Sequence, residues 1–303
     1  RCSDCMSSMI AFRGMRCAVN PVIGREKDFF HPLPVNRKHR ILIAGGGPAG
    51  MEAALTATEK GHTVILCEER AKLGGALKFA DNGAPNKLTI ERYRDSQIRK
   101  VMESPFIEVR LNTKVDETVV AEVQPDVLIA AVGALPVTPP IPGVDGKNVI
   151  FGADLMPDMQ LGKKVTVIGG GMIGCEESIY LSDLGYEVTI VELQEDIAAD
   201  CLKYPFLWLH HEVEARPIRV LTGSSCSSIT VDSITVKNLF SGEEETFDCD
   251  TVVLAAGTRA RSDVVEALRP LCDRFYVVGD AKQAKNVMMA VRDGYDAVVD
   301  LGL

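Results

Sequence analysis

Apolar residues in this chain gather in short runs separated by longer segments of mixed character. A run at 41–44 is followed by a glycine-rich turn, a helical pattern over 49–60 and a second apolar run at 63–67. Short apolar runs are typical of buried parallel strands, and a helix between two of them forms a βαβ unit. We therefore predict that regular structure begins at Arg40 with such a unit.

The same pattern returns 124 residues further along the chain. A run at 165–168 precedes a second glycine-rich turn, a helical pattern ending at Leu184 and an apolar run at 187–191. AVGA around Gly133 and AAGT around Gly257 each end an apolar segment and have the same offset. Repetition at one offset indicates two copies of one nucleotide-binding architecture, so we predict an α/β fold with two Rossmann-like, three-layer domains.

Three segments lie outside the two copies. Residues 1–36 have no sustained period and contain three prolines, which predicts an irregular arm. Short alternating runs between 221 and 250 predict a β-meander. Residues 286–301 carry a helical pattern and predict a final helix.

Composition excludes several classes of protein. With 46 % hydrophobic residues over 303 positions, the chain can pack about two domains, which excludes disorder as its main state. The net charge of −9 repels phosphate backbones, so no nucleic acid partner is expected. The longest apolar run, 127–137, is too short to cross a bilayer and contains Pro136, so no membrane partner is expected.

Each copy carries a GxGxxG turn between its first strand and its helix. The first glycine permits the tight turn, the second lets the backbone approach a pyrophosphate, and the third lets helix and strand pack closely. The phosphates then lie at the positive end of the helix dipole. An acid 18 residues after the third glycine accepts the ribose hydroxyls of an adenosine. The residues are Gly45, Gly47, Gly50 and Glu68 in the first copy, and Gly169, Gly171, Gly174 and Glu192 in the second.

Two further elements belong to the first copy. Leu73-Gly74-Gly75 is a second close-approach loop for the same ligand. Residues 276–280 form an apolar segment that ends in Asp280, just before the final helix. Taken alone, Asp280 fits a cofactor ligand and a helix cap or turn residue equally well.

Nine cysteines fall into two groups. Three cluster in the arm, and six are scattered; we expect the six to be buried thiols in a reducing cytosol, which predicts a cytoplasmic protein. The chain opens with Arg1 and polar residues, so no signal peptide is expected. Because it opens without Met, we expect its start to be a cut boundary. The scattered cysteines are Cys67, Cys175, Cys201, Cys226, Cys249 and Cys272.

Several motifs resemble those of a known superfamily. EE..AKLGGAL, AAVGALPVTPPIPG and VVGDA are similar to the two-dinucleotide flavoprotein disulfide reductases. RCSDC, RCAVNPVIGRE, RILIAGGGPAGMEAALTATEKGH and ERYRDSQI resemble the C-terminal half of the 2,4-dienoyl-CoA reductase / trimethylamine dehydrogenase family, NADH:flavin oxidoreductases of the old yellow enzyme lineage. The resemblance covers nearly the whole chain and is weak from 201 to 251. The family's N-terminal FMN-bearing barrel has no counterpart here.

The resemblance implies FAD in the first copy and NAD(H) in the second. It puts Gly75 and Ala76 at the FAD pyrophosphate, Val115 at the adenine and Asp280 at a ribityl hydroxyl. The implied FAD residues are Gly45, Gly47, Pro48, Ala49, Gly50, Glu68, Glu69, Gly75, Ala76, Val115, Gly133, Gly279, Asp280 and Met288, with Met289 beside it. The implied NAD(H) residues are Gly169, Gly171, Met172, Ile173, Gly174, Glu192 and Gly257. The expected domains are an arm at 1–38, an FAD domain at 39–155 plus 259–303, and an inserted NAD(H) domain at 156–258.

The arm has three of the four cysteines that bind a [4Fe–4S] cluster in this family. Cys2, Cys5 and Cys17 match the first, second and fourth ligands, while serines and a methionine occupy the position of the third. One ligand is therefore missing unless Ser8 or a residue outside this chain replaces it. The alternative is a degenerate arm with ordinary thiols.

The resemblance implies an NADH-oxidising flavoprotein module. Hydride would pass from NADH to FAD, and electrons onward through the arm to the absent FMN barrel or a partner. Hydride transfer needs no side-chain acid or base, so no catalytic residue is expected. The redox CxxxxC and CxxC motifs of disulfide reductases are absent, so thiol chemistry is not expected. The alternative is a non-catalytic ADP-binding domain of a larger dehydrogenase; Glu192 and Asp280 favour the enzyme.

Overall fold

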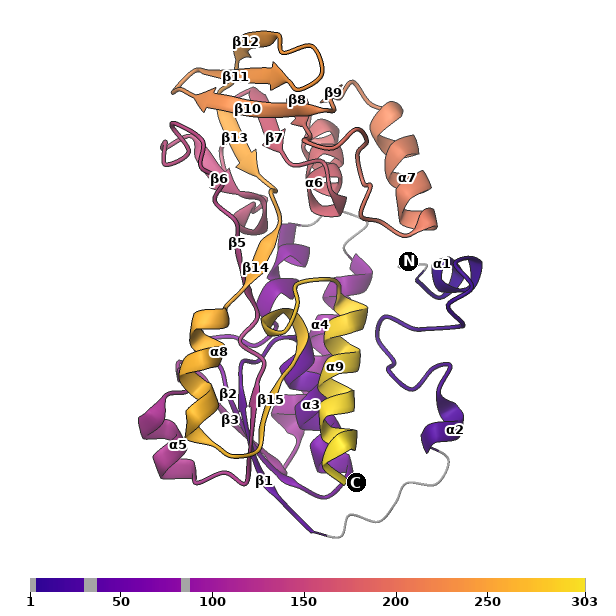
Figure 1. Ribbon diagram of the computed structural model, residues 1–303, viewed down its shortest axis with the longest axis vertical. Coiled ribbons are helices and arrows are strands. Elements are labelled where there is room, and N and C mark those ends of the chain that lie inside the picture. Colours follow the sequence, from indigo (N-terminus) through magenta and orange to yellow (C-terminus); the bar gives the residue numbers. More distant parts are fainter. Residues whose placement is uncertain (1–3, 30–36, 83–87, 303) are drawn as a thin grey trace.

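Two α/β units form the computed structural model, one above the other in Figure 1. The structure describes residues 4–29, 37–82 and 88–302. An antiparallel pair, β5 (Ala134–Pro136) with β14 (Thr258–Ala260), carries the chain out of the lower unit and back into it. Both units contain a five-stranded parallel sheet, which confirms the predicted α/β fold class.

The first unit is a parallel sheet between two helical layers. Its strands, in sheet order, are β15 (Phe275–Val277), β4 (Val127–Ala130), β1 (Arg40–Ala44), β2 (Thr63–Cys67) and β3 (Ile107–Arg110). One face carries α3 (Pro48–Glu59), α4 (Leu88–Glu103) and α9 (Val287–Val299), and the other carries α5 (Glu117–Val123) and α8 (Ser262–Leu268). Short 3₁₀ segments are η1 (Gly75–Asn82), η3 (Arg269–Leu271), η4 (Gly279–Ala281) and η5 (Asp300–Gly302). Burial on both faces explains the continuous apolar runs of the strands.

The second unit has helices on one face of its sheet and strands on the other. Its parallel strands, in sheet order, are β6 (Val149–Phe151), β13 (Thr251–Leu254), β7 (Lys164–Ile168), β8 (Glu187–Val191) and β9 (Arg219–Leu221). One face carries α6 (Met172–Asp183) and α7 (Lys203–Glu214), and η2 (Gly152–Asp154) follows β6. The other face carries the predicted meander, β10 (Ser224–Ile229), β11 (Ser233–Asn238) and β12 (Glu244–Asp248).

The two copies agree in backbone detail as well as in sequence. A Cβ atom at Gly50 would lie 1.9 Å from the carbonyl oxygen of Gly45, and one at Gly174 would lie 1.8 Å from that of Gly169. Any side chain at these positions would push helix and strand apart. The third glycine of each loop is therefore required by the close packing of α3 on β1 and of α6 on β7.

Two features of the chain differ from the sequence expectation. The arm is not irregular throughout, because it contains α1 (Asp4–Ile10), which contacts α7, and α2 (Glu26–Phe29). Helices this short show no readable period and depend on tertiary contacts. In addition, β6 pairs with β13 of the second sheet, although residues 39–155 were expected to form the first domain.

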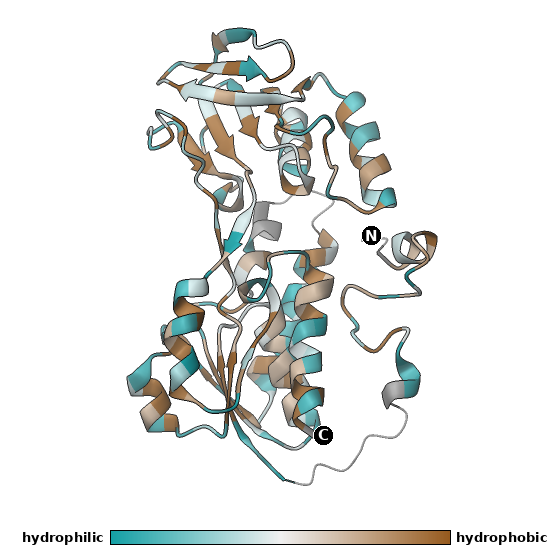
Figure 2. Cartoon of the chain, viewed as in Figure 1, coloured by the Kyte–Doolittle hydropathy of each residue, from teal (hydrophilic) through white to brown (hydrophobic). Residues whose placement is uncertain are grey.

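Apolar residues concentrate inside both units. Figure 2 shows brown segments along the strands of each sheet and teal segments along the outer helices and loops. The strands β1, β4 and β13 are buried over nearly their whole length. In the ranges that the structure describes, no helix has the length and apolar character needed to cross a membrane.

Candidate functional site

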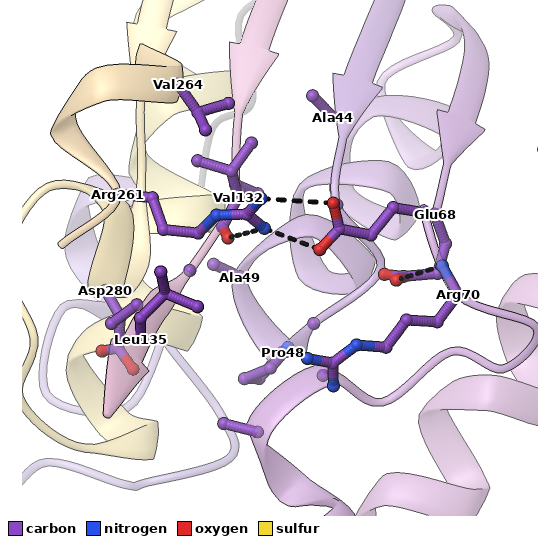
Figure 3. Close-up of a pocket in the computed structure, with 18 of the residues that line it drawn as sticks. Ala44, Pro48, Ala49, Glu68, Arg70, Val132, Leu135, Arg261, Val264 and Asp280 are labelled. Carbon is purple, nitrogen blue, oxygen red and sulfur yellow. Dashed lines mark hydrogen bonds and ion pairs between the residues drawn. The ribbon is translucent and has the colours of Figure 1, made fainter. Parts of the chain in front are cut away.

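A cavity of about 320 Å³ opens at the carboxyl ends of the strands of the first sheet. This edge is where open parallel sheets bind their ligands. Figure 3 shows side chains from both sides of the cavity pointing toward one another. Most residues expected to bind FAD line it: Gly45, Gly47, Pro48, Ala49, Glu68, Glu69, Gly75, Ala76, Val115, Gly133 and Asp280.

Three other expected FAD residues, Gly50, Gly279 and Met288, do not line the cavity, and neither does Met289 beside Met288. Gly50 packs α3 on β1, as described above. Gly279 has a φ of +64°, and a Cβ there would lie 2.7 Å from the Cβ of Ala49, so it permits close packing behind the wall. Met288 is buried at the start of α9. Gly279 therefore supports the cavity wall at Ala49, and Gly50 supports the packing of α3 on β1.

Glu68 is buried at the end of β2, and its carboxylate holds the first glycine loop. Oε2 accepts a hydrogen bond from the backbone N–H of Gly46 at 2.8 Å, and Oε1 accepts one from Arg70 N–H at 2.9 Å. Each carboxylate oxygen has a further lone pair that can accept a hydroxyl proton. The geometry suits the adenosine ribose of a dinucleotide.

Four cationic residues line the cavity, and sequence reasoning missed them. They are Arg70, Lys78, Lys114 and Arg261. Arg261 binds Glu69 and thereby lowers the pKa of that carboxyl. Lys78 binds Asp154 of η2, with 2.6 Å between Nζ and Oδ1. Figure 3 shows the Arg70 guanidinium beside Pro48, at the N-terminus of α3. Cationic side chains at a helix N-terminus favour a phosphate-bearing ligand.

Asp280 lies at the opposite end of the cavity from Glu68. It is half-buried in η4, and burial raises the pKa of its carboxyl. Oδ1 accepts a hydrogen bond from Lys285 N–H at 3.2 Å, as a turn residue would. Asp280 therefore makes a turn contact and also lines the cavity.

The second unit repeats the carboxylate geometry of the first. Oε2 of Glu192 accepts a hydrogen bond from Gly170 N–H at 2.5 Å, and Oε1 accepts one from Gln194 N–H at 2.7 Å. Both donors lie 124 positions after their counterparts in the first unit. Gly171 caps α6, whose first residues are Met172 and Ile173. Gly174 packs the helix as described above, and Gly257 follows β13 as Gly133 follows β4.

The arm does not offer a four-thiolate ligand set in the part that the structure describes. Cys2 lies outside the described residues. Cys5 is exposed and Cys17 is half-buried, and the described ranges contain no group of three or more His, Cys, Asp or Glu side chains that could hold a metal ion. Ser7 and Ser8 are buried, and the hydroxyl of Ser7 has no hydrogen-bond partner there.

Three of the six scattered cysteines are fully buried, although all six were expected to be. Cys67, Cys175 and Cys249 are buried, whereas Cys201, Cys226 and Cys272 are half-buried. Burial raises the pKa of Cys67 to about 11, and that of Cys175 and Cys201 to about 12. Thiols with such pKa values are protonated at neutral pH and react slowly.

Comparison with known proteins places the chain in a family. Residues 39–291 match the family model described as pyridine nucleotide-disulphide oxidoreductase. The chain is 33 % identical to an NADH oxidase of Thermoanaerobacter brockii over 287 residues, which are 93 % of this chain and 44 % of that protein. It is 31 % identical to a cinnamate reductase of Clostridium sporogenes, covering 98 % of this chain and 44 % of the relative. The chain thus spans less than half the length of these relatives.

Solved structures also match nearly the whole of this chain and about half of their own length. The fold matches a 2-naphthoyl-CoA reductase with a TM-score of 0.87 and 28 % identity, covering 98 % of this chain and 45 % of that chain. It matches histamine dehydrogenase from Rhizobium sp. 4-9 with a TM-score of 0.82 and 18 % identity, covering 100 % and 50 % of the chains, a likeness of fold alone. The chain therefore belongs to the pyridine nucleotide-disulphide oxidoreductase family and matches the C-terminal FAD/NAD-binding half of the old-yellow-enzyme-like NADH oxidases and reductases.

Proposed function

We propose that this chain is the electron-entry module of an NADH-dependent flavoprotein. The second unit binds NADH, the first unit binds FAD, and electrons pass to an acceptor outside the chain. The observation that carries this proposal is the equivalence of Glu68 and Glu192. Each buried carboxylate accepts a hydrogen bond from the second residue of its glycine-rich turn and another from the backbone two residues further on. Both units therefore offer an adenosine-binding acid.

The cavity of the first unit has the residues that FAD requires. Gly47 and the N-terminus of α3 would receive the pyrophosphate, with Gly75 opposite them: a Cβ at Gly75 would lie 2.8 Å from the Cα of Gly47. Glu68 would hold the ribose, Val115 the adenine and Asp280 a ribityl hydroxyl. When bound, FAD supplies the acceptor for hydride from NADH.

The contribution of the chain to the reaction is binding and orientation. Hydride transfer between two held cofactors needs alignment and exclusion of water, and it needs no proton from a side chain. The antiparallel pair of β5 and β14 links the two units, and Leu135 and Thr258 of this pair line the cavity. We therefore assign no catalytic acid or base.

The acceptor is proposed to be an FMN barrel, in the same polypeptide or in a separate subunit. The chain covers 44 % of the NADH oxidase and of the cinnamate reductase, and 45 % of a bilirubin reductase from Mediterraneibacter gnavus. Relatives named for different substrates share this half. That supports selection of the substrate by the other half.

A reducing, cytoplasmic setting is part of the proposal. Every cysteine in the described ranges is a free thiol, from the arm to the second unit. Free cysteines in such number persist in a reducing compartment.

The first test identifies the bound nucleotide. The purified chain is denatured, and the supernatant is chromatographed against FAD, FMN and ADP standards. We expect FAD. Recovery of ADP alone would support the structural-domain alternative, and recovery of FMN would contradict the assignment of the first unit.

The second test measures the oxidation of NADH with different electron acceptors. We expect the isolated chain to oxidise NADH with ferricyanide as acceptor and to show no turnover with enoyl thioesters, enones or amines. Addition of the FMN barrel should restore that turnover. Steady reduction of an enone by the isolated chain would place the substrate site within these residues and overturn the proposal.

A further inference from the structure

The duplication allows the two glycine loops to be compared position by position. In each unit a second loop folds over the glycine loop. The backbone N–H of Gly74 donates to the carbonyl oxygen of Gly46 at 2.9 Å. The N–H of Ala198, 124 residues later, donates to the carbonyl oxygen of Gly170 at 2.7 Å. The covering loops of the two units are therefore structurally equivalent.

The residues of the two covering loops differ. In the first unit, Gly74 has a φ of +117° and Gly75 a φ of +54°. In the second unit, Ala198 keeps the left-handed backbone with a φ of +51°, although its side chain is fully buried. Residues with a side chain rarely adopt this conformation, so the surrounding contacts hold the loop in place.

Two positions after Gly74 and Ala198, the equivalent residues are Ala76 and Asp200, so the second unit has a carboxylate where the first has a methyl group. A Cβ at Gly171 would lie 3.6 Å from Oδ1 and 3.7 Å from Oδ2 of Asp200, so this carboxylate faces the second glycine of the loop. At the equivalent glycine of the first unit, Gly47, the Cα of Gly75 at 3.8 Å is the nearest atom to such a Cβ among the described residues, apart from the two chain neighbours of Gly47, and no carboxylate of the described ranges lies within 4 Å of it.

The second glycine is the position at which the backbone approaches a dinucleotide pyrophosphate. Gly171 also caps α6, whose N-terminus carries the positive end of the helix dipole. A carboxylate at this point interacts favourably with the dipole in the absence of ligand. It also repels a pyrophosphate that takes the same place.

We propose that Asp200 lowers the affinity of the second unit for NAD(H) by holding a carboxylate at the pyrophosphate position, from which it must move when the dinucleotide binds. The inference rests on the proposed function, since it assigns NAD(H) to this loop. It explains a physical difference between the sites. Ala76 leaves the first loop open for a cofactor that stays bound, whereas Asp200 makes the second loop suitable for a cosubstrate that must exchange.

The test compares four proteins: wild type, Asp200→Ala, Asp200→Asn and the control Glu214→Gln. Glu214 is an exposed acid at the end of α7 in the same unit, so its variant removes one charge without altering the carboxylate at Gly171. Dissociation constants for NADH, ADP-ribose and adenosine are measured anaerobically by calorimetry, with any FAD reduced beforehand so that NADH binds without reacting. We expect both Asp200 variants to bind NADH and ADP-ribose at least fivefold more tightly, with adenosine unchanged. Glu214→Gln should behave as wild type.

The outcomes separate this inference from the proposed function. Equal NADH affinity in wild type and both Asp200 variants would overturn the inference and leave NADH binding established. If only Asp200→Ala bound NADH and ADP-ribose more tightly, the effect would come from the size of the side chain and not from its charge. That result would also overturn the inference. Equal tightening for adenosine would do the same, because adenosine has no pyrophosphate. Absence of NADH and ADP-ribose binding in all four proteins would instead overturn the proposed function, and the inference with it.

Discussion

Arg261 and Glu69 form an ion pair at the cavity of the first unit, although 192 residues separate them in the chain. Nη1 of Arg261 lies 2.6 Å from Oε1 of Glu69, and Nη2 lies 3.2 Å from Oε2. Nη1 also lies 3.4 Å from the carbonyl oxygen of Val132. Glu69 follows β2, and Arg261 follows β14, where the chain returns from the second unit. The pair therefore ties the returning chain to the wall of the nucleotide cavity.

Replacement of Arg261 by alanine should weaken FAD binding. The variant leaves the Glu69 carboxylate unpaired in a cavity that must accept a pyrophosphate, and we expect about a tenfold rise in the dissociation constant, or roughly 1.4 kcal/mol. Flavin fluorescence titration of the apoprotein measures it. The matched control is Arg269→Ala, because Arg269 pairs with Glu266 at an exposed surface. Equal losses in the two variants would show that the ion pair at the cavity has no special role.

Replacement of Glu68 by alanine should reduce both the affinity for FAD and the free energy of unfolding. The carboxylate accepts hydrogen bonds from Gly46 and Arg70, and the Gly46 bond is buried. Loss of the acceptor leaves the N–H of Gly46 without a partner, at a cost of about 1–3 kcal/mol. We expect a lower unfolding temperature and little bound flavin. Glu68→Gln retains one acceptor oxygen, so its unfolding temperature and flavin content should lie between those of wild type and Glu68→Ala. If Glu68→Ala unfolds at the same temperature as wild type and binds as much flavin, the proposed role of Glu68 is contradicted.

The second unit should prefer NADH to NADPH. The Glu192 carboxylate is buried at the end of β8, and the following residues 193–195 include no arginine to neutralise a 2′-phosphate. Repulsion between this carboxylate and the phosphate should favour NADH in kcat/KM by roughly tenfold or more. Steady-state kinetics with ferricyanide measure the ratio. Glu192→Gln should reduce it, and equal values for both cofactors in wild type would refute the prediction.

Glu52 should make the free energy of unfolding fall as pH rises from about 4.5 to about 7. Burial raises the pKa of Glu52 to about 7, although its Oε2 accepts a hydrogen bond from Gln97 at 3.0 Å. Between these two pKa values the folded protein holds a proton that the unfolded chain has already released. The free energy of unfolding therefore decreases as pH rises above about 4.5 and levels off once pH exceeds about 7. Glu52→Gln should remove about 2 kcal/mol of this loss.

Denaturant titrations at several pH values measure the effect of Glu52 as the difference between variant and wild type. The control is Glu103→Gln, an exposed acid at the end of α4. Parallel pH profiles for wild type and Glu52→Gln would show that Glu52 titrates normally in the folded protein.

Local spacing in the sequence was enough to predict both βαβ units. The strands at β1, β2, β7 and β8, and the helices between them, depend on apolar runs and glycines within about 25 residues of one another. Glu68 and Glu192 follow from the same spacing, because an acid at the end of the second strand lies beside the first loop in any such unit. Gly45, Gly47 and Glu68 line one cavity in the first unit for this reason.

Contacts between distant segments followed no such local rule. Arg261 reaches Glu69 because β14 returns from the second unit at that point, and no period in the sequence reports where a crossing chain returns. The pairing of β6 with β13 and the contact of α1 with α7 are of the same kind. Asp200 lies in a stretch with no motif, and its position against Gly171 depends on the left-handed turn at Ala198. Sequence spacing specifies neighbours along one unit, whereas packing of the whole chain determines which charged side chains meet at the cofactor loops.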